Sequence, residues 1–315
     1  MKINLIDKLV GCIYTVFTPF TSDGSIDYCS LSNYLSFLYN NGARVFYVMA
    51  YNSRYSQLSD DEIMELNEFV TKKVKKFNRE NVVILADPIH CSTKTSLKFA
   101  HHAKDVGADI ISLICREKYF NDDQILEHFD FIGRESQFPI LIHEMPFLSG
   151  YNGLQMHWPN SLFNKIPKIS NVIAIKEDAK DLETTIKVLE LEPSIRVIIA
   201  GSKKSLLSFK NHGCKAYLNG ISMIAPKIGI KFWDAFNSDD EETLSFLINE
   251  IETPFWDKCV KKYGWHRVNK AFLECAGLMQ RHERMPMPSL NDEEFSDLVN
   301  IYNDLKIKII EKNLL

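Results

Sequence analysis

The chain has 315 residues, with 37 Lys or Arg against 41 Asp or Glu and a formal net charge of −4. This length allows one large α/β domain or two ordinary ones, and the mildly acidic balance, with residues 72–76 as the densest basic run, argues against nucleic-acid binding. No apolar run approaches the roughly 18 residues of a membrane span, and the first residues lack a signal-peptide layout, so we expect a cytoplasmic protein with no membrane partner.

Short apolar segments rich in β-branched residues recur along the chain, with helical patterns between them. The predicted strands are residues 11–18, 44–51, 82–87, 109–115, 139–145, 172–177, 196–201 and 216–221. A capping box at Ser59 and Glu62 opens the helix predicted over 60–77. Near-continuous apolar strands that alternate with helices indicate a parallel sheet buried on both faces. Eight such units predict an α/β fold of the (β/α)8 class, the closed TIM barrel.

Beyond residue 236 the pattern becomes helical only. Helices are predicted over residues 244–263, 266–281 and 293–311. Pro254 is expected to kink or split the first of them, because proline lacks the N–H that a helix interior needs. We therefore predict a barrel domain at 1–236 and a helical extension at 237–315 that packs on the barrel or on a neighbouring subunit.

The motifs that usually hold metals and nucleotides are missing from the sequence. The seven cysteines are dispersed without a C-x-x-C pair, and no H-E-x-x-H motif places two histidines on one helix face. The sequence also lacks the G-x-G-x-x-G turn of a doubly wound open sheet, which is the alternative fold, and a phosphate-binding loop. We predict reduced thiols, no metal and no cofactor.

A lysine at the end of the sixth predicted strand is the first candidate for chemistry. Burial favours the neutral amine of Lys176, and a neutral amine is what attack on a ketone requires. The alternative is a lysine whose stem packs inside while its head reaches water. His143 holds the matching place on the preceding strand. Since neighbouring strands lie about 4.8 Å apart and chemistry collects at the C-terminal strand ends of a barrel, we expect both side chains in one pocket.

Motifs distributed over nearly the whole chain carry a family resemblance. In chain order they are Thr18-Pro19-Phe20, residues 23–27, residues 58–62, Gly107-Ala108-Asp109, residues 143–150, Ile175-Lys176-Glu177 followed by Asp181, and Arg284-Met285-Pro286. Together they resemble the dihydrodipicolinate synthase and N-acetylneuraminate lyase group of Schiff-base-forming class I aldolases. The ending Leu148-Ser149-Gly150 leans toward the neuraminate-lyase branch.

The resemblance implies a mechanism and an assembly. Lys176 would attack the ketone of a pyruvate-like 2-oxo acid, or of a sugar-derived oxo acid, and lose water to give an iminium. The iminium is an electron sink that allows a carbon–carbon bond to break or a proton to leave. The resemblance also implies a homo-oligomer, either a dimer or a tetramer.

The residues around this lysine depart from the family pattern. The proton-shuttle tyrosine corresponds to His143, whose imidazole can move protons near neutral pH or can serve only as a hydrogen-bonded pocket residue. Tyr51 replaces a threonine of the G-T-T-G-E carboxylate loop, so a rebuilt relay between His143 and Tyr51 is one hypothesis. In the same loop Asn52 and Ser53 are candidate hydrogen-bond donors for the substrate. Arg54 is either a carboxylate clamp or a surface or interface arginine.

Two further departures concern the substrate. Tyr119, which precedes Phe120, resembles the first residue of the tyrosine pair that reaches a neighbouring subunit's site, and we assign it to substrate binding. Leu148 stands where some synthases carry an arginine, which argues against a true dihydrodipicolinate synthase.

The sequence therefore supports an enzyme hypothesis and two alternatives. The favoured one is a lyase or aldolase that uses Lys176, His143 and Tyr51 for catalysis. A non-catalytic or binding-only descendant is the competing interpretation, because the tyrosine and both threonines are replaced together. A dehydratase that forms the same imine without breaking a carbon–carbon bond is the third.

Overall fold

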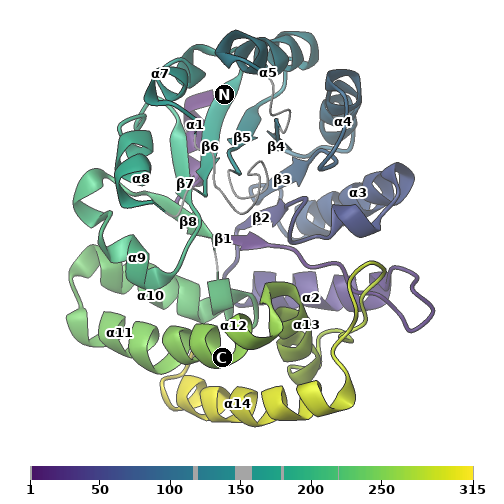
Figure 1. Ribbon diagram of the computed structural model, residues 1–315, viewed down its shortest axis with the longest axis vertical. Helices are drawn as coiled ribbons and strands as arrows, with labels where there is room; N and C mark the ends of the chain where they lie inside the picture. The colour runs from purple at the N-terminus through teal and green to yellow at the C-terminus, as the bar shows by residue number, and fades with distance from the viewer. Residues whose placement is uncertain (1, 116–119, 146–157, 179–180, 219, 315) are drawn as a thin grey trace.

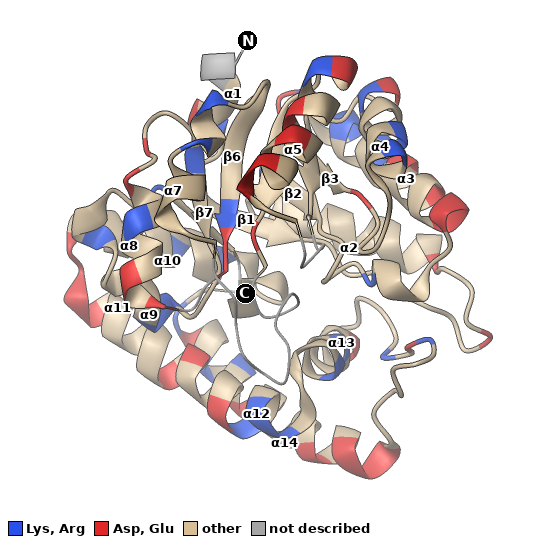
Figure 2. Ribbon diagram, turned by 45° about the horizontal axis from the view of Figure 1, so that its top comes forward, with Lys and Arg blue, Asp and Glu red and all other residues tan. Residues whose placement is uncertain are grey.

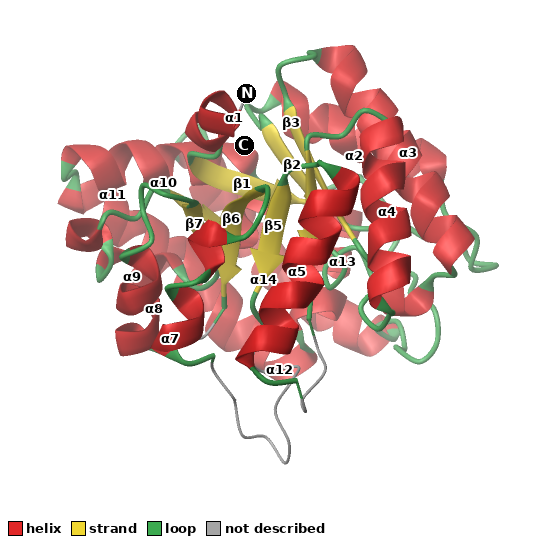
Figure 3. Ribbon diagram, turned by 90° about the horizontal axis from the view of Figure 1, so that it is seen from above, coloured by secondary structure: helices red, strands yellow, loops and turns green. Residues whose placement is uncertain are grey.

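The computed structural model describes residues 2–115, 120–145, 158–178, 181–218 and 220–314. Its centre is a closed barrel of parallel strands in sequence order, in which β8 pairs back onto β1 (Figures 1 and 3). The strands are β1 (Gly11–Thr15), β2 (Val45–Val48), β3 (Val82–Ala86), β4 (Ile110–Leu113), β5 (Ile140–His143), β6 (Val172–Glu177), β7 (Arg196–Ile199) and β8 (Ala216–Leu218). This arrangement confirms the predicted (β/α)8 barrel.

Helices surround the barrel (Figure 3). They are α1 (Lys2–Lys8), α2 (Tyr28–Asn40), α3 (Asp60–Phe77), α4 (Thr93–Asp105), α5 (Asp122–Ser136), α7 (Asn160–Phe163), α8 (Leu182–Leu189), α9 (Lys203–Leu207) and α10 (Pro226–Ser238). The bounds of α3 are those predicted. Its capping box is present, since Ser59 Oγ accepts from the Glu62 N–H at 3.2 Å and the Glu62 carboxylate accepts from the Ser59 N–H at 3.0 Å.

Most strands end earlier than the sequence pattern predicts. β1 ends at Thr15 instead of residue 18, although Val16 and Phe17 are buried as deeply as the strand itself. These residues pack into the core from the loop that follows the strand. An apolar loop of this kind has the same composition as a strand, so the pattern cannot mark where pairing stops.

Two separate cores result from the alternation of side chains along each strand. The inner core fills the barrel and includes Tyr47, Leu141, Ala174 and Ile198. Leu9, which follows α1, is fully buried in the same core, so the N-terminal segment packs into the barrel. The outer core lies between the strands and the helices.

The C-terminal extension packs against the barrel along the lower edge of Figure 1. It contains α11 (Glu241–Phe246), wide helical turns at Leu247–Glu252 and Phe255–Val260, α12 (Lys261–Tyr263), α13 (Trp265–Cys275) and α14 (Asp292–Glu311). Pro254 keeps helical dihedral angles between the two wide turns, which accommodate its missing N–H. The helix predicted over 266–281 ends at Cys275, because Gly277 takes a left-handed conformation with φ of 72°.

Side-chain contacts join this extension to the loops of the barrel. Lys270 Nζ donates to the Thr18 carbonyl at 2.7 Å. Arg284 forms two hydrogen bonds, at 2.8 and 2.9 Å, with the Glu62 carboxylate at the start of α3. The eighth barrel helix, α10, ends at Ser238, just beyond the predicted domain boundary.

Charged residues are found mainly on the helices that surround the strands (Figure 2). Charged residues buried in the barrel are therefore exceptions that need a local explanation. Among the helices of the described ranges, none combines the length and the apolar character that crossing a bilayer requires.

Candidate active site

Lys176 and His143 occupy neighbouring strand ends inside the barrel. They are register partners on β6 and β5, and Lys176 Nζ lies 2.7 Å from His143 Nε2. Each side chain is at most 1% exposed. Side chains alternate between the two faces of each strand, and Leu141 and Ala174 point into the inner core. His143 and Lys176, two residues further along, therefore also point into the barrel, one layer nearer its C-terminal mouth.

Asp178 completes a cluster of three ionisable groups. Its Oδ2 accepts from Lys176 Nζ at 2.7 Å and lies 4.0 Å from His143 Nε2. Asp178 was not among the predicted site residues, whereas Asp181 was named as the acidic residue of the family motif. Asp181 is the N-cap of α8, where its carboxylate accepts from the Thr184 N–H. Strand alternation was the available signal, because a residue two places after Lys176 points to the same side.

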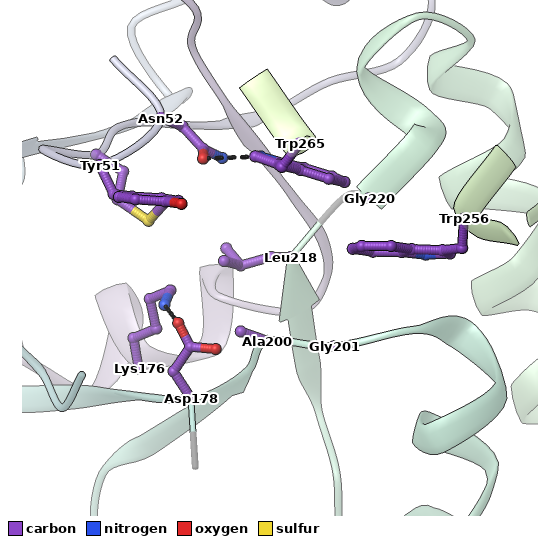
Figure 4. Close-up of a pocket in the computed structure, with 11 residues that line it drawn as sticks. Tyr51, Asn52, Lys176, Asp178, Ala200, Gly201, Leu218, Gly220, Trp256 and Trp265 are labelled. Atoms are coloured by element: carbon purple, nitrogen blue, oxygen red, sulfur yellow. Dashed lines mark hydrogen bonds and ion pairs between the residues drawn. The ribbon is translucent and has the colours of Figure 1, made fainter. Parts of the chain in front are cut away.

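A cavity of about 220 Å³ opens beside the Lys176–Asp178 pair (Figure 4). Its described walls come from the ends of four strands and from the C-terminal extension. They are Lys176 in β6 and Asp178 after it, Ala200 and Gly201 after β7, Leu218 and Gly220 at β8, Met49, Tyr51 and Asn52 after β2, and Trp256 and Trp265. The pocket thus holds charge on the β6 side and apolar surface elsewhere.

The loop after β2 is held in place by its own polar groups. Asn52 Nδ2 donates to Thr15 Oγ1 at 2.9 Å, and Asn52 Oδ1 accepts from Trp265 Nε1 at 3.1 Å. Ser53 Oγ donates to the Val16 carbonyl at 2.6 Å. Asn52 lines the cavity, whereas Ser53 is fully buried behind the wall and is not part of its lining.

Arg54 turns away from the cavity, into the C-terminal extension. It has a left-handed backbone with φ of 60°, and its Nη2 donates to Met287 Sδ at 3.0 Å. Its guanidinium also lies 5.5 Å from the ring centre of Tyr51. Arg54 thus lies neither at the surface nor in the described lining of the cavity, and its role stays a prediction.

Tyr51 is the loop residue whose ring reaches the cavity (Figure 4). Its ring packs edge-on against His266 at 4.7 Å. Burial raises the pKa of the Tyr51 phenol, Arg54 opposes that change and Asp178 adds to it, so the phenol stays a hydrogen-bond donor at neutral pH. The remaining predicted site residue, Tyr119, lies outside the described residues.

A further buried carboxyl group, that of Glu144, follows His143 at the end of β5. Burial raises the pKa of Glu144 to about 8, with smaller contributions from Glu177 and Asp178, while the positive charge of Lys176 opposes the rise. Glu144 is therefore mainly protonated at neutral pH. The sequence analysis did not single it out. In the described ranges, no group of three or more His, Cys, Asp or Glu is arranged to hold a metal ion.

Comparisons of sequence place this chain within a known family. The model of the dihydrodipicolinate synthetase family matches residues 8–305. The 4-hydroxy-tetrahydrodipicolinate synthase of Bacillus velezensis is 25% identical over 300 residues, which cover 94% of this chain and 99% of the relative. An uncharacterized DapA-like lyase of Pyrococcus abyssi is 24% identical over 308 residues, covering 94% and 96%.

Comparisons of structure agree. Dihydrodipicolinate synthase from Oceanobacillus iheyensis superposes with a TM-score of 0.85 at 18% identity and covers 98% of this chain and 100% of that one. N-acetylneuraminate lyase from Mycoplasma synoviae gives 0.82 at 21% identity, covering 96% and 99%. At these identities the structures support the fold alone. The family match over nearly the whole sequence confirms the predicted resemblance, and the chain belongs to the dihydrodipicolinate synthetase family.

Proposed function

We propose that this protein is a Schiff-base-forming lyase or aldolase for a pyruvate-like 2-oxo acid, with Lys176 as the nucleophile. Family membership supports lyase or aldolase chemistry in general. The observation that carries the specific proposal is the position of Lys176 Nζ. The atom lies at the wall of a cavity, 2.7 Å from both His143 Nε2 and Asp178 Oδ2.

The three side chains provide a route for activating the amine. The Asp178 carboxylate stabilises the ammonium form of Lys176. A neutral His143 that carries its proton on Nδ1 can accept a proton from Lys176 at Nε2. The imidazolium that forms stays 4.0 Å from the Asp178 carboxylate, so the positive charge moves without leaving its counter-ion. The neutral amine can then attack the ketone carbon of the substrate.

Imine formation and bond cleavage follow from this arrangement. The imidazolium of His143 returns its proton as the carbinolamine oxygen leaves as water, which gives the iminium. For an aldol substrate, the hydroxyl proton on C4 goes to the Asp178 carboxylate, the C3–C4 bond breaks, and its electron pair moves into the iminium to form an enamine. Protonation of the enamine and hydrolysis of the imine release pyruvate and an aldehyde.

We assign substrate orientation to Asn52 and Tyr51. Both line the cavity, and each has a polar hydrogen: the second amide hydrogen of Asn52 and the phenol of Tyr51. Ser53 and Arg54 are left out of this assignment because their polar groups are directed to Val16 and Met287. The altered carboxylate loop and the histidine in place of the shuttle tyrosine support a function that differs from that of a true dihydrodipicolinate synthase.

A binding-only role is the second candidate, and one observation favours it. Lys176 is 1% exposed and is held in an ion pair with Asp178, so its ammonium form is stabilised in the absence of a ligand. Thermal stabilisation by oxo acids without any product would support that role. A dehydratase would share imine formation with the lyase and would differ only in the product.

Assembly is a separate part of the proposal. We propose a homo-oligomer, either a dimer or a tetramer, in line with the family resemblance. Phe120, which follows Tyr119, is 38% exposed and is available for a contact between subunits. Light scattering at several protein concentrations would measure the assembly, and a monomer at all of them would contradict this part.

Borohydride reduction in the presence of pyruvate, followed by peptide mass mapping, tests the proposal. The adduct is expected on Lys176 and is lost in Lys176→Ala. Lys270 and Lys203 are internal controls, because both are about 1% exposed and neither lines the cavity. Lys270 is the stricter control, since burial lowers its pKa to about 8. Reduction of Lys270 instead of Lys176, or no adduct with any oxo acid, would contradict the proposal.

A further inference from the structure

The pocket is divided into a charged end and an apolar end. Among its described walls, the charged side chains are Lys176 and Asp178, which form an ion pair at the end of β6. Across the cavity stand the indoles of Trp256 and Trp265, with Leu218 between them and Lys176 (Figure 4). A ligand whose ketone meets Lys176 therefore extends toward an aromatic wall.

The aromatic wall is rigid. The two indoles are stacked, with ring centres 5.1 Å apart and planes at 18°. Phe255, fully buried, packs edge-on against both at 6.0 Å, and Trp265 is also fixed by its hydrogen bond to Asn52. Preorganised aromatic surface binds flat ligands without first losing side-chain freedom.

Small residues keep space open beside this wall. Ala200, Gly201 and Gly220 lie along one side of the cavity. A Cβ atom on Gly220 would lie 3.3 Å from Glu252 Oε1, and Gly220 has a left-handed φ of 51°, so both packing and backbone favour glycine there. Glu252 is itself fixed behind the wall by its ion pair with Lys203.

Few polar side chains line the apolar end in the described part of the pocket. They are Asn52 and Tyr51, together with the two indole N–H groups. The Trp265 N–H already donates to the Asn52 carbonyl oxygen, and the buried Trp256 N–H has no hydrogen-bond partner among the described residues. A polyhydroxylated chain placed there would bury more hydroxyl groups than these few groups can bond, which lowers affinity. The volume of about 220 Å³ also lies below the usual range for drug-sized ligands, which favours a compact substrate.

We propose that the substrate is a compact 2-oxo acid with an aryl group on C4, whose ring lies against the Trp256–Trp265 pair. This inference rests on the proposed function and names the substrate class for it. The reaction is the reverse aldol step described above: C3–C4 cleavage of a 4-aryl-4-hydroxy-2-oxobutanoate releases pyruvate and an aryl aldehyde, and the C4 hydroxyl proton passes to Asp178.

Two matched substrates separate tail recognition from the chemistry at Lys176. The aldol adducts of pyruvate with benzaldehyde and with glyceraldehyde share the same oxo-acid head and differ in the tail. We expect kcat/KM for the benzaldehyde adduct to exceed that for the glyceraldehyde adduct by at least about tenfold. The aryl ring gains a contact with the indoles, and the glyceraldehyde tail would lose hydrogen bonds to water when its hydroxyl groups are buried. Borohydride trapping of pyruvate, which has no tail, measures the head site alone.

Variants of Trp256 assign the preference to the aromatic wall. Trp256→Ala should lower kcat/KM for the benzaldehyde adduct about tenfold and change pyruvate trapping less than twofold, while Trp256→Phe should retain most of the preference. Trp233→Ala is the matched control, because Trp233 also stacks on an aromatic ring, that of Phe236, but does not line the cavity. Trp256→Leu replaces the alanine variant if the latter does not fold.

The outcomes distinguish this inference from the proposed function. Normal pyruvate trapping without a preference for the aryl adduct would overturn the substrate class and leave Lys176 as the nucleophile. Equal losses for both adducts in Trp256→Ala would do the same. No Lys176 adduct with pyruvate or with either aldol substrate would overturn both.

Discussion

The amine of Lys176 and the imidazole of His143 meet because the two residues are register partners on β6 and β5. His143 does not belong to the described lining of the cavity, whereas Lys176 and Asp178 do. In the proposed mechanism, the imidazole therefore serves imine formation at the amine, and the carboxylate accepts the proton of the substrate's C4 hydroxyl. This division of roles gives the two catalytic predictions below.

Replacing His143 should slow the formation of the imine itself. The variant His143→Phe removes the proton acceptor that lies beside the Lys176 amine together with Asp178. General-base catalysis typically contributes about 10²- to 10⁴-fold to a rate, so imine formation should slow by a factor in that range. Rapid mixing with pyruvate and quenching with borohydride measures the rate. His128→Phe is the matched control, because His128 bonds Thr93 between α4 and α5. An unchanged rate in His143→Phe would exclude His143 from the mechanism.

Replacing Asp178 should affect two steps in different ways. Asp178→Asn removes the negative charge that favours the Lys176 ammonium, so the pH profile of imine formation should move to lower pH. Cleavage of an aldol substrate should fall by about 10²-fold or more, because the acceptor of the hydroxyl proton is lost. Pyruvate trapping and aldehyde release measure the two steps separately.

Asp181→Ala is the control for that pair of measurements. Asp181 caps α8, and losing a cap of this kind costs about 1 kcal/mol of stability. Neither the pH profile nor the cleavage rate should change. A shift of equal size in both variants would show that the charge at Asp178 has no special role.

Glu144 should make the protein less stable as pH rises. Its carboxyl pKa is about 8 in the folded protein against an ordinary value of 4.5, so the folded state binds more protons between these values. The free energy of unfolding therefore falls as pH rises through this window. Glu144→Gln mimics the neutral acid and should be more stable than the parent protein above pH 8. Urea unfolding at several pH values measures this, and parallel pH dependences in the two proteins would contradict it.

Arg284 should stabilise the join between the extension and the barrel. Its guanidinium bonds both oxygens of Glu62 and the Gln57 carbonyl, at 2.8 to 3.2 Å, and it also bonds Gly24. Lysine cannot reproduce this forked contact, so Arg284→Lys should lower the free energy of unfolding by about 1.5–3 kcal/mol. Arg134→Lys, at an exposed pair with Glu127, should cost less than about 0.5 kcal/mol. Equal effects in urea unfolding would contradict the account.

The sequence predicted the parts of the fold that depend on local pattern. Buried parallel strands have a distinctive composition, and the shared position of Lys176 and His143 at adjacent strand ends follows from strand alternation and pairing. Asp178 follows from the same alternation and could have been predicted. The family motif named Asp181 as its downstream acidic residue, and the structure places Asp181 at the start of a helix.

The loop residues could not be placed in this way. The direction of Arg54 depends on a left-handed backbone and on Met287, which is far away in the sequence. Ser53 is buried because Val16, in another loop, offers a carbonyl to its hydroxyl. Trp256 and Trp265 reach the cavity only because the C-terminal extension folds back over the barrel. Each of these contacts is tertiary and leaves no periodic signal in the chain.

A crystal structure of the protein soaked with pyruvate is the most direct test of the central claim. The account predicts continuous electron density between Lys176 Nζ and C2 of pyruvate, with His143 and Asp178 still beside the nitrogen and the carboxylate near Asn52 and Tyr51. Pyruvate bound without a covalent link, or an occupied cavity in which Lys176 keeps its ammonium paired with Asp178, would contradict it.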